Sequence, residues 1–126
     1  PFFLCRAFAA HVGEMREGRI VNIADWRGAR PDTRYLAYSL TKAGVLAMTK
    51  ALALALAPNV LVNAIAPGAI LPPPGRGQEY LEGLAGQIPI GRIGSPTDVG
   101  KALAYLLSAD FVTGETIFVT GGEQLV

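Results

Sequence analysis

The sequence predicts an α/β fold in which the strands of a parallel β-sheet alternate with long helices. Short runs rich in apolar and β-branched residues at 19–24, 60–66 and 116–120 have the composition of buried parallel strands. Helical patterns at 35–57 and 95–107 separate these runs. Right-handed crossovers join such strands to parallel neighbours, so we expect three strands, about half of a doubly wound sheet.

The first elements are a helix at 3–16 and the strand at 19–24. Leu4, Phe8 and Val12 recur at helical spacing within the first of these segments. The chain enters this helix directly and has no initiator Met. We therefore expect it to lie within a longer architecture.

The helix at 35–57 contains an alternating Ala/Leu run at 51–57 that also has the period of a strand. Helix is the better prediction, because Ala and Leu are strong helix formers and this run has no β-branched residue. Leu at every second position faces both sides of a helix, so we expect burial nearly all round, by the sheet and by a partner subunit. Pro58 ends the helix.

The later elements begin and end at recognisable signals. Ser95, Pro96 and Asp98 occupy the N-cap, first and third positions of a capping-box-like helix start. The other expected segments are loops at 25–34 and 69–77, a short helix at 78–86, and Gly121-Gly122 closing the last strand.

The composition indicates a single domain with an apolar core. The chain has 126 residues, 51% hydrophobic and 17% charged. Its net charge of +1 argues against nucleic acid as a partner. Cys5 is the only cysteine, which excludes an intrachain disulfide or cysteine-based zinc site and favours the cytoplasm. No signal peptide opens the chain, and the apolar run 51–57 is far shorter than the about 18 residues of a membrane span, so we expect a soluble protein.

Tyr38 and Lys42 are the candidate acid/base pair. They are four residues apart on the helix at 35–57, so they share one face. A nearby ammonium favours phenolate, so we expect Lys42 to lower the pKa of Tyr38 from its ordinary value of about 10. Tyr38 would then exchange protons near neutral pH.

These residues converge with two other segments on one crevice. Ligands of open parallel sheets bind beyond the carboxyl ends of the strands. Asp25 follows the first strand, the 67–70 turn follows the second, and Tyr38 and Lys42 open the helix between them.

The motifs of the chain resemble the C-terminal half of a short-chain dehydrogenase/reductase, in order and in spacing. The resemblance implies the C-terminal half of a Rossmann-like sheet, with the glycine-rich phosphate loop upstream of these residues. The matching segments are Gly18-Arg19-Ile20-Val21-Asn22-Ile23, Tyr38-x3-Lys42, Val62-Asn63-Ala64-Ile65-Ala66-Pro67-Gly68, Arg92-Ile93-Gly94-Ser95-Pro96-Thr97-Asp98-Val99, Val112-Thr113-Gly114 and Val119-Thr120-Gly121-Gly122.

The resemblance also implies roles for individual residues. Tyr38 would be the catalytic acid/base, and Lys42 would bind the nicotinamide ribose. Pro67, Gly68 and Ile70 would lie against the nicotinamide. The implied cofactor is NADP, with NAD as the other candidate. The family's helices pair across two-fold axes, so a homodimer or homotetramer through the helices at 3–16 and 35–57 is expected.

The chain departs from the family pattern at three positions. Asp25 stands where serine is usual, Leu71 where threonine is common, and Thr120 where aspartate is usual. The aspartate resembles pteridine reductases, which reduce pterins or dihydrofolates. A carboxylate accepts hydrogen bonds from ring N–H and amino groups, whereas a serine suits a carbonyl. As a catalytic residue, Asp25 would also relay a proton to a ring nitrogen through Tyr38 or water. The other reading of Asp25 is a cap for local N–H groups.

The leading hypothesis is an NADP-dependent reductase that acts on a C=N or C=O bond of a small molecule, with a pteridine as substrate. A generic carbonyl or alcohol dehydrogenase is one alternative, and a catalytically incomplete interaction module is the other. A Gly-x3-Gly-x-Gly turn in upstream coding sequence would separate the last reading from the first two. Trp26 and Arg27 either line the pocket or pack within the loop after the first strand. Tyr80 and Leu84 are candidates for a substrate lid.

Overall fold

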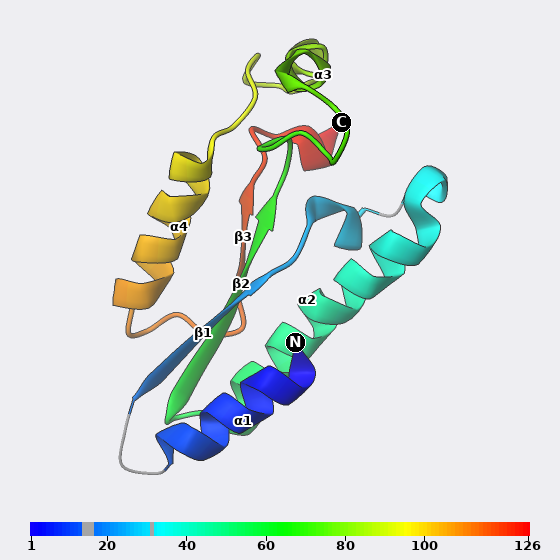
Figure 1. The fold of residues 1–126 in the computed structure, drawn as a ribbon. Helices are drawn as coiled ribbons and strands as arrows, with labels where there is room; N and C mark the ends of the chain where they lie inside the picture. Colours follow the sequence, from blue (N-terminus) through cyan, green and yellow to red (C-terminus); the bar gives the residue numbers. More distant parts are fainter. Residues whose placement is uncertain (14–16, 31) are drawn as a thin grey trace.

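The fold is a parallel sheet with helices on both faces (Figure 1). A computed structural model describes residues 1–13, 17–30 and 32–126. Its three strands, β1 (Gly18–Ile23), β2 (Val60–Pro67) and β3 (Thr116–Val119), lie in the order β1-β2-β3 and pair in parallel. The predicted α/β fold with three strands alternating with helices is confirmed.

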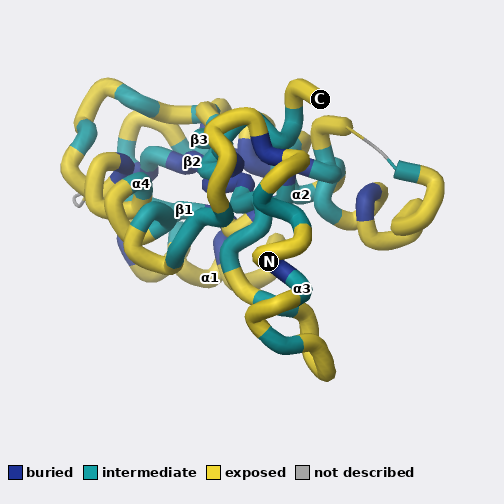
Figure 2. The backbone as a smooth tube through the Cα atoms, turned by 90° about the horizontal axis from the view of Figure 1, so that it is seen from above, coloured by how far each residue is buried: buried dark blue, intermediate teal, exposed yellow. Residues whose placement is uncertain are grey.

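Strand β2 is the centre of the core. Its Val62, Ala64 and Ile65 have no exposed surface, because β2 has a strand on each edge and helices on both faces. Figure 2 shows this buried segment between helix α4 (Pro96–Ser108) on one side and α2 (Leu36–Leu56) on the other.

The observed helix ends follow glycine and capping signals. Helix α1 (Phe2–Val12) ends four residues earlier than predicted, at Gly13 with a φ of 66°, and residues 14–16 lie outside the described part of the chain. The predicted helix at 78–86 is instead α3 (Gln78–Glu82) followed by a separate 3₁₀ turn (Ala85–Gln87). Ser95 and Asp98 form the predicted capping box of α4.

One side of helix α2 is exposed in the single chain, and the predicted cover by a partner subunit stays a prediction. Leu40 and Leu54 are 62% and 85% exposed, because only one side of the helix packs on the sheet. The segment Thr33–Leu56, with mean hydropathy 1.3, is long and apolar enough to cross a membrane by length and composition alone. The apolar run 51–57 within it is too short to cross a membrane on its own. Core helices of soluble proteins meet the same criterion. Thr49 ties α2 to the sheet by accepting a 3.0 Å hydrogen bond from Asn22.

Candidate active site

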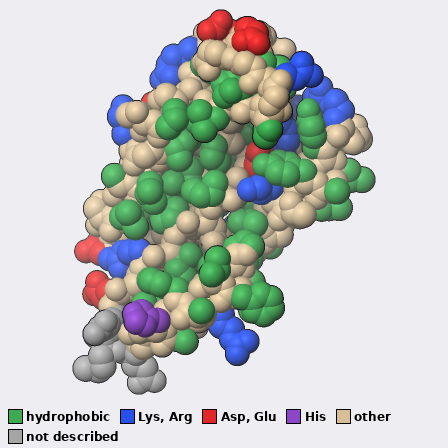
Figure 3. All heavy atoms as spheres, in the orientation of Figure 1, with side chains coloured by type: hydrophobic (Ala, Val, Ile, Leu, Met, Phe, Trp, Pro, Cys, Tyr) green, Lys and Arg blue, Asp and Glu red, His purple; other side chains and the backbone are tan. Residues whose placement is uncertain are grey.

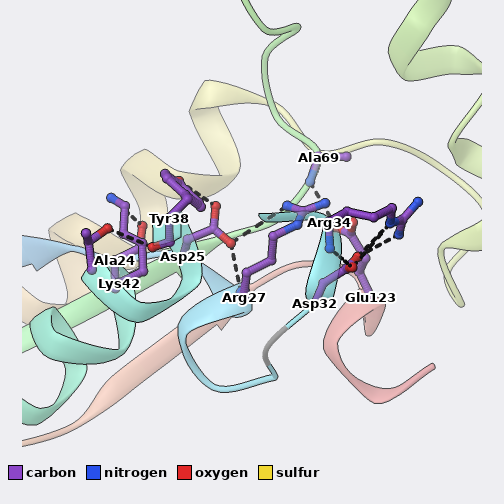
Figure 4. Close-up of polar contacts among 10 residues, drawn as sticks. Ala24, Asp25, Arg27, Asp32, Arg34, Tyr38, Lys42, Ala69 and Glu123 are labelled. Carbon is purple, nitrogen blue, oxygen red and sulfur yellow. Dashed lines mark hydrogen bonds and ion pairs between the residues drawn. The ribbon is translucent and has the colours of Figure 1, made fainter. Parts of the chain in front are cut away.

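The carboxyl ends of the strands carry Asp25 and Tyr38 in direct contact. Asp25 follows β1 and caps a 3₁₀ turn (Trp26–Gly28), accepting the Arg27 N–H at 2.8 Å through Oδ1. Its Oδ2 accepts the Tyr38 hydroxyl at 2.9 Å (Figure 4). A Cβ on Gly28 would lie 2.7 Å from the Lys42 carbonyl carbon, so this glycine lets the turn rest on α2. The packing of this turn against α2 also brings the Asp25 carboxylate to the Tyr38 hydroxyl.

Lys42 lies on the same helical face but is engaged by the sheet. Its Nζ donates to the carbonyl oxygens of Ile23 at 3.1 Å and Ala24 at 3.3 Å. It lies 5.6 Å from the centre of the Tyr38 ring. Two of its three N–H groups are thus held by the end of β1, and the third remains for a ligand.

Tyr38 holds its proton more tightly than a free tyrosine. Partial burial raises the pKa of Tyr38 from 10.0 to about 12, and the hydrogen bond and charge of Asp25 act in the same direction. The charge of Arg27 acts in the opposite direction. The expectation that Lys42 would lower this pKa is therefore wrong. Asp25 accepts directly from the hydroxyl, whereas the Lys42 ammonium lies farther away on backbone carbonyls.

Replacing Asp25 with Asn is expected to lower the pKa of Tyr38 from about 12 toward 10, because it removes the negative charge that disfavours phenolate. Titration of tyrosinate absorbance, with Tyr38→Phe as the reference spectrum, measures the change. Asp32→Asn is the control, since among the described residues the Asp32 carboxylate bonds Arg34 and does not contact Tyr38. An unchanged titration midpoint of Tyr38 in the Asp25→Asn variant would show that Asp25 does not raise this pKa.

Asp25 and Tyr38 open into a cavity of about 450 Å³. Gly68 and Ala69 of the turn after β2 line it too, whereas the Ile70 side chain lies in a separate depression of about 230 Å³. The structure thus brings Asp25, Tyr38 and Gly68 together. The lining residues are Asp25, Arg27, Tyr35, Tyr38, Gly68, Ala69, Leu71, Pro73, Tyr80, Leu81, Leu84 and Glu123.

Arg27 lies between two aromatic rings at the wall of this cavity. Its guanidinium carbon is 4.6 Å from the Trp26 ring centre and 5.2 Å from that of Tyr35. It also forms an ion pair with Asp25 at 3.8 Å. Arg27 therefore lines the cavity, whereas Trp26 does not line it and is buried at 9% exposure.

Residues of two later segments also line the cavity. Tyr80 and Leu84, the candidates for a substrate lid, line it from α3 and the turn that follows. Glu123 reaches in from the C-terminal segment, and sequence reasoning missed it. The available signal was its place directly after Gly121-Gly122, where the chain turns back over the strand ends.

Comparison with known proteins identifies the family of this chain. A family model described as enoyl-(acyl carrier protein) reductase matches residues 1–124. The 3-oxoacyl-[acyl-carrier-protein] reductase FabG of Aquifex aeolicus is 45% identical in an alignment 119 positions long that covers 86% of this chain and 46% of the relative. The chain belongs to the short-chain dehydrogenase/reductase family.

Other members match nearly the whole chain. The BbsD subunit of (2S)-[(R)-hydroxy(phenyl)methyl]succinyl-CoA dehydrogenase from Thauera aromatica is 42% identical over 98% of this chain and 52% of its own. The crystal structure of FolM alternative dihydrofolate reductase 1 from Brucella suis in complex with NADP superposes with a TM-score of 0.94 and 32% identity. The superposition covers 100% of this chain and 51% of the FolM chain. The chain spans about half the length of the curated relatives it matches.

Proposed function

We propose that this chain is the catalytic half of an NADP-dependent short-chain reductase in which Tyr38 gives a proton to a C=N or C=O bond, and that its substrate is a pteridine or dihydrofolate. The observation that carries the proposal is the hydrogen bond of 2.9 Å from Tyr38 to Asp25 at the cavity wall. NAD remains the alternative cofactor. On this proposal, residues 1–126 form part of a Rossmann-like nucleotide-binding domain whose glycine-rich half precedes them.

The residues at the strand ends suit the nicotinamide end of such a cofactor. Lys42 keeps one N–H beyond its two carbonyl partners, and the Tyr38 hydroxyl lies on the same helical face, so both can meet ribose hydroxyls. Pro67, Gly68 and Ile70 supply the turn that would lie against the ring. When bound, the cofactor supplies the hydride.

The chain's own groups supply the proton. With a pKa of about 12, Tyr38 stays protonated at neutral pH and serves as the acid in the reductive direction. Asp25 orients this hydroxyl, and the phenolate left after transfer is disfavoured beside the carboxylate. Tyr38 is 45% exposed, so water can return the proton.

Asp25 favours a nitrogen heterocycle over a ketone. Its carboxylate lines the cavity as an acceptor, which suits ring N–H and amino groups. The tyrosine rings and apolar side chains of the same cavity suit a flat ring. The similarity to the Brucella suis FolM structure supports this choice. The higher identity to FabG supports the runner-up, a 3-oxoacyl or other carbonyl substrate.

In a full-length protein carrying this chain, Asp25→Ser is expected to lower kcat/KM for a dihydropteridine by about 100-fold and to leave reduction of a 3-oxoacyl thioester within about threefold. The serine replaces a charged acceptor with two oxygens by a neutral hydroxyl, which accepts hydrogen bonds from substrate N–H groups more weakly but donates to a carbonyl. NADPH oxidation with each substrate measures both values, with Asp32→Ser as the control. Faster reduction of the thioester by the unaltered protein, together with an unaffected pteridine rate in the variant, would favour the runner-up.

The proposed enzyme is a cytoplasmic homodimer or homotetramer formed through α1 and α2. Exposed apolar side chains gather on these helices, with Phe3 and Leu4 78% exposed and Leu54 85% exposed. Leu54→Lys is expected to shift the full-length protein toward monomer in sedimentation at micromolar concentration, because it places a charge in this contact. Phe111→Lys, at a fully exposed loop position, is the control. A monomeric unaltered protein would contradict the assembly.

A further inference from the structure

The segment after β3 turns back over the active-site cavity. Gly121 and Gly122 have φ values of 65° and 91°, in the left-handed region that side chains disfavour. A Cβ on Gly121 would also lie 2.8 Å from Ile88, and one on Gly122 would lie 3.0 Å from Pro89. These two glycines therefore allow the reversal, and the residue that follows them is Glu123.

The Glu123 carboxylate holds the turn after β2. Its Oε2 accepts the Ala69 N–H at 3.0 Å (Figure 4). A Cβ on Gly68 would lie 2.4 Å from this oxygen, so the carboxylate fills the space that glycine leaves. The Gly68 N–H donates to the Val119 carbonyl at 3.0 Å. Two consecutive amides of the turn are thus held by the last strand and the segment after it.

The acceptor for the Ala69 N–H is the charged carboxylate of Glu123, although a neutral backbone carbonyl could also accept this bond. It lines the same cavity as Asp25 and Tyr38. In the part of the chain that the structure describes, Glu123 forms no ion pair with Lys, Arg or His. Its bond to Ala69 is charge-assisted and stronger than a neutral one, which suits a segment that must stay fixed while ligands enter and leave.

We propose that Glu123 is a positioning residue that fixes the Pro67–Ile70 turn for binding of the nicotinamide nucleotide. The inference rests on the proposed function, in which this turn faces the nicotinamide. Without the carboxylate, the Ala69 amide loses its acceptor and the turn samples other conformations. Binding must then order the turn again, which weakens nucleotide affinity more than it slows proton transfer at Tyr38.

The test compares Glu123→Ala, Glu123→Gln and a control, Glu115→Ala, in a full-length protein carrying this chain. Glu115 is an exposed glutamate just before β3, at the far end of that strand. The Gln side chain keeps an acceptor for the Ala69 N–H, so it should rescue the defect. Backbone hydrogen exchange across 67–71, the dissociation constant for NADPH, and the separate kcat and KM values are measured.

Glu123→Ala should speed exchange of the turn amides and raise both the NADPH dissociation constant and the nucleotide KM by about tenfold, with kcat changed less than about threefold. Glu123→Gln and Glu115→Ala should stay within about threefold of the unaltered protein. Unchanged exchange in Glu123→Ala, or an equal loss from kcat alone, would overturn the role of Glu123. If the unaltered protein binds no NADPH, the proposed function fails and the nucleotide role fails with it. If it binds NADPH but reduces none of the offered substrates, only the proposed reaction fails, because exchange and affinity still decide the role of Glu123.

Discussion

Replacing Tyr38 with Phe in a full-length protein carrying this chain is expected to lower turnover by about 100-fold or more. Phe preserves the ring and removes the hydroxyl that donates to Asp25 at 2.9 Å. Tyr38 and this carboxylate both line the cavity, so the hydroxyl is within the site where a substrate would bind. With no proton to give, hydride transfer would leave an uncompensated anion on the substrate.

Two measurements separate this effect from a loss of folding. The affinity for NADPH should fall by much less than turnover, because Phe loses one proposed ribose contact while Lys42 and the Pro67–Ile70 turn remain in place. Tyr105→Phe is the matched control, since Tyr105 is 54% exposed on α4 and does not line the cavity. Turnover of the Tyr38 variant near that of the control would contradict the assignment of Tyr38 as the acid.

Periodicity predicted the elements of this fold but not how completely they are covered. The strands were found because a strand buried on both faces reads as a continuous apolar run, as at β2. The Ala/Leu run in α2 was correctly assigned to a helix. Its expected burial assumed a second covering surface, and Leu54 remains exposed in the structure of this chain. Sequence periodicity identifies apolar faces, whereas the surface that covers each face depends on tertiary and quaternary contacts.

The candidate site was predicted where residues are close in sequence or follow a strand, and missed elsewhere. The sharing of one face by Tyr38 and Lys42 follows from helix geometry, and the position of Asp25 follows from the end of β1. The predicted direction of the Tyr38 pKa shift was wrong, because the shift depends first on how far the hydroxyl is buried and then on its hydrogen bond with Asp25, and both come from tertiary contacts. Glu123 reaches Ala69 across 54 positions of sequence, and no local pattern encodes that contact.

The second large effect concerns residues 1–126 on their own, which we expect neither to bind NADPH at micromolar concentration nor to turn over. Pyrophosphate binding in this class of sheet needs a glycine-rich turn at a helix N-terminus. The candidate stretch, Gly75-Arg76-Gly77, follows prolines rather than a strand and leads into the five-residue helix α3. Lys42 and the turn after β2 would hold only the nicotinamide end, a minority of the ligand's contacts.

The sheet gives a second reason for this expectation. Strand β1 lies at one edge and pairs only with β2 among the described strands, so its other edge has unpaired backbone groups. Figure 3 shows hydrophobic side chains gathered on the face that carries α4, where Leu103, Tyr105 and Leu107 are 37%, 54% and 49% exposed. An open edge beside an apolar face favours association between copies of the isolated segment.

Calorimetry of the isolated segment with NADPH tests the expectation, and light scattering on the same sample follows aggregation. A full-length protein carrying these residues is the positive control and should bind NADPH with a dissociation constant in the micromolar range or tighter. Micromolar binding by residues 1–126 alone would contradict the expectation, because it would mean that the chain completes a nucleotide site without a glycine-rich phosphate loop. The part of the site built by Tyr38, Lys42 and the Pro67–Ile70 turn would then contribute most of the affinity, and the assignment of pyrophosphate binding to residues outside this segment would be wrong.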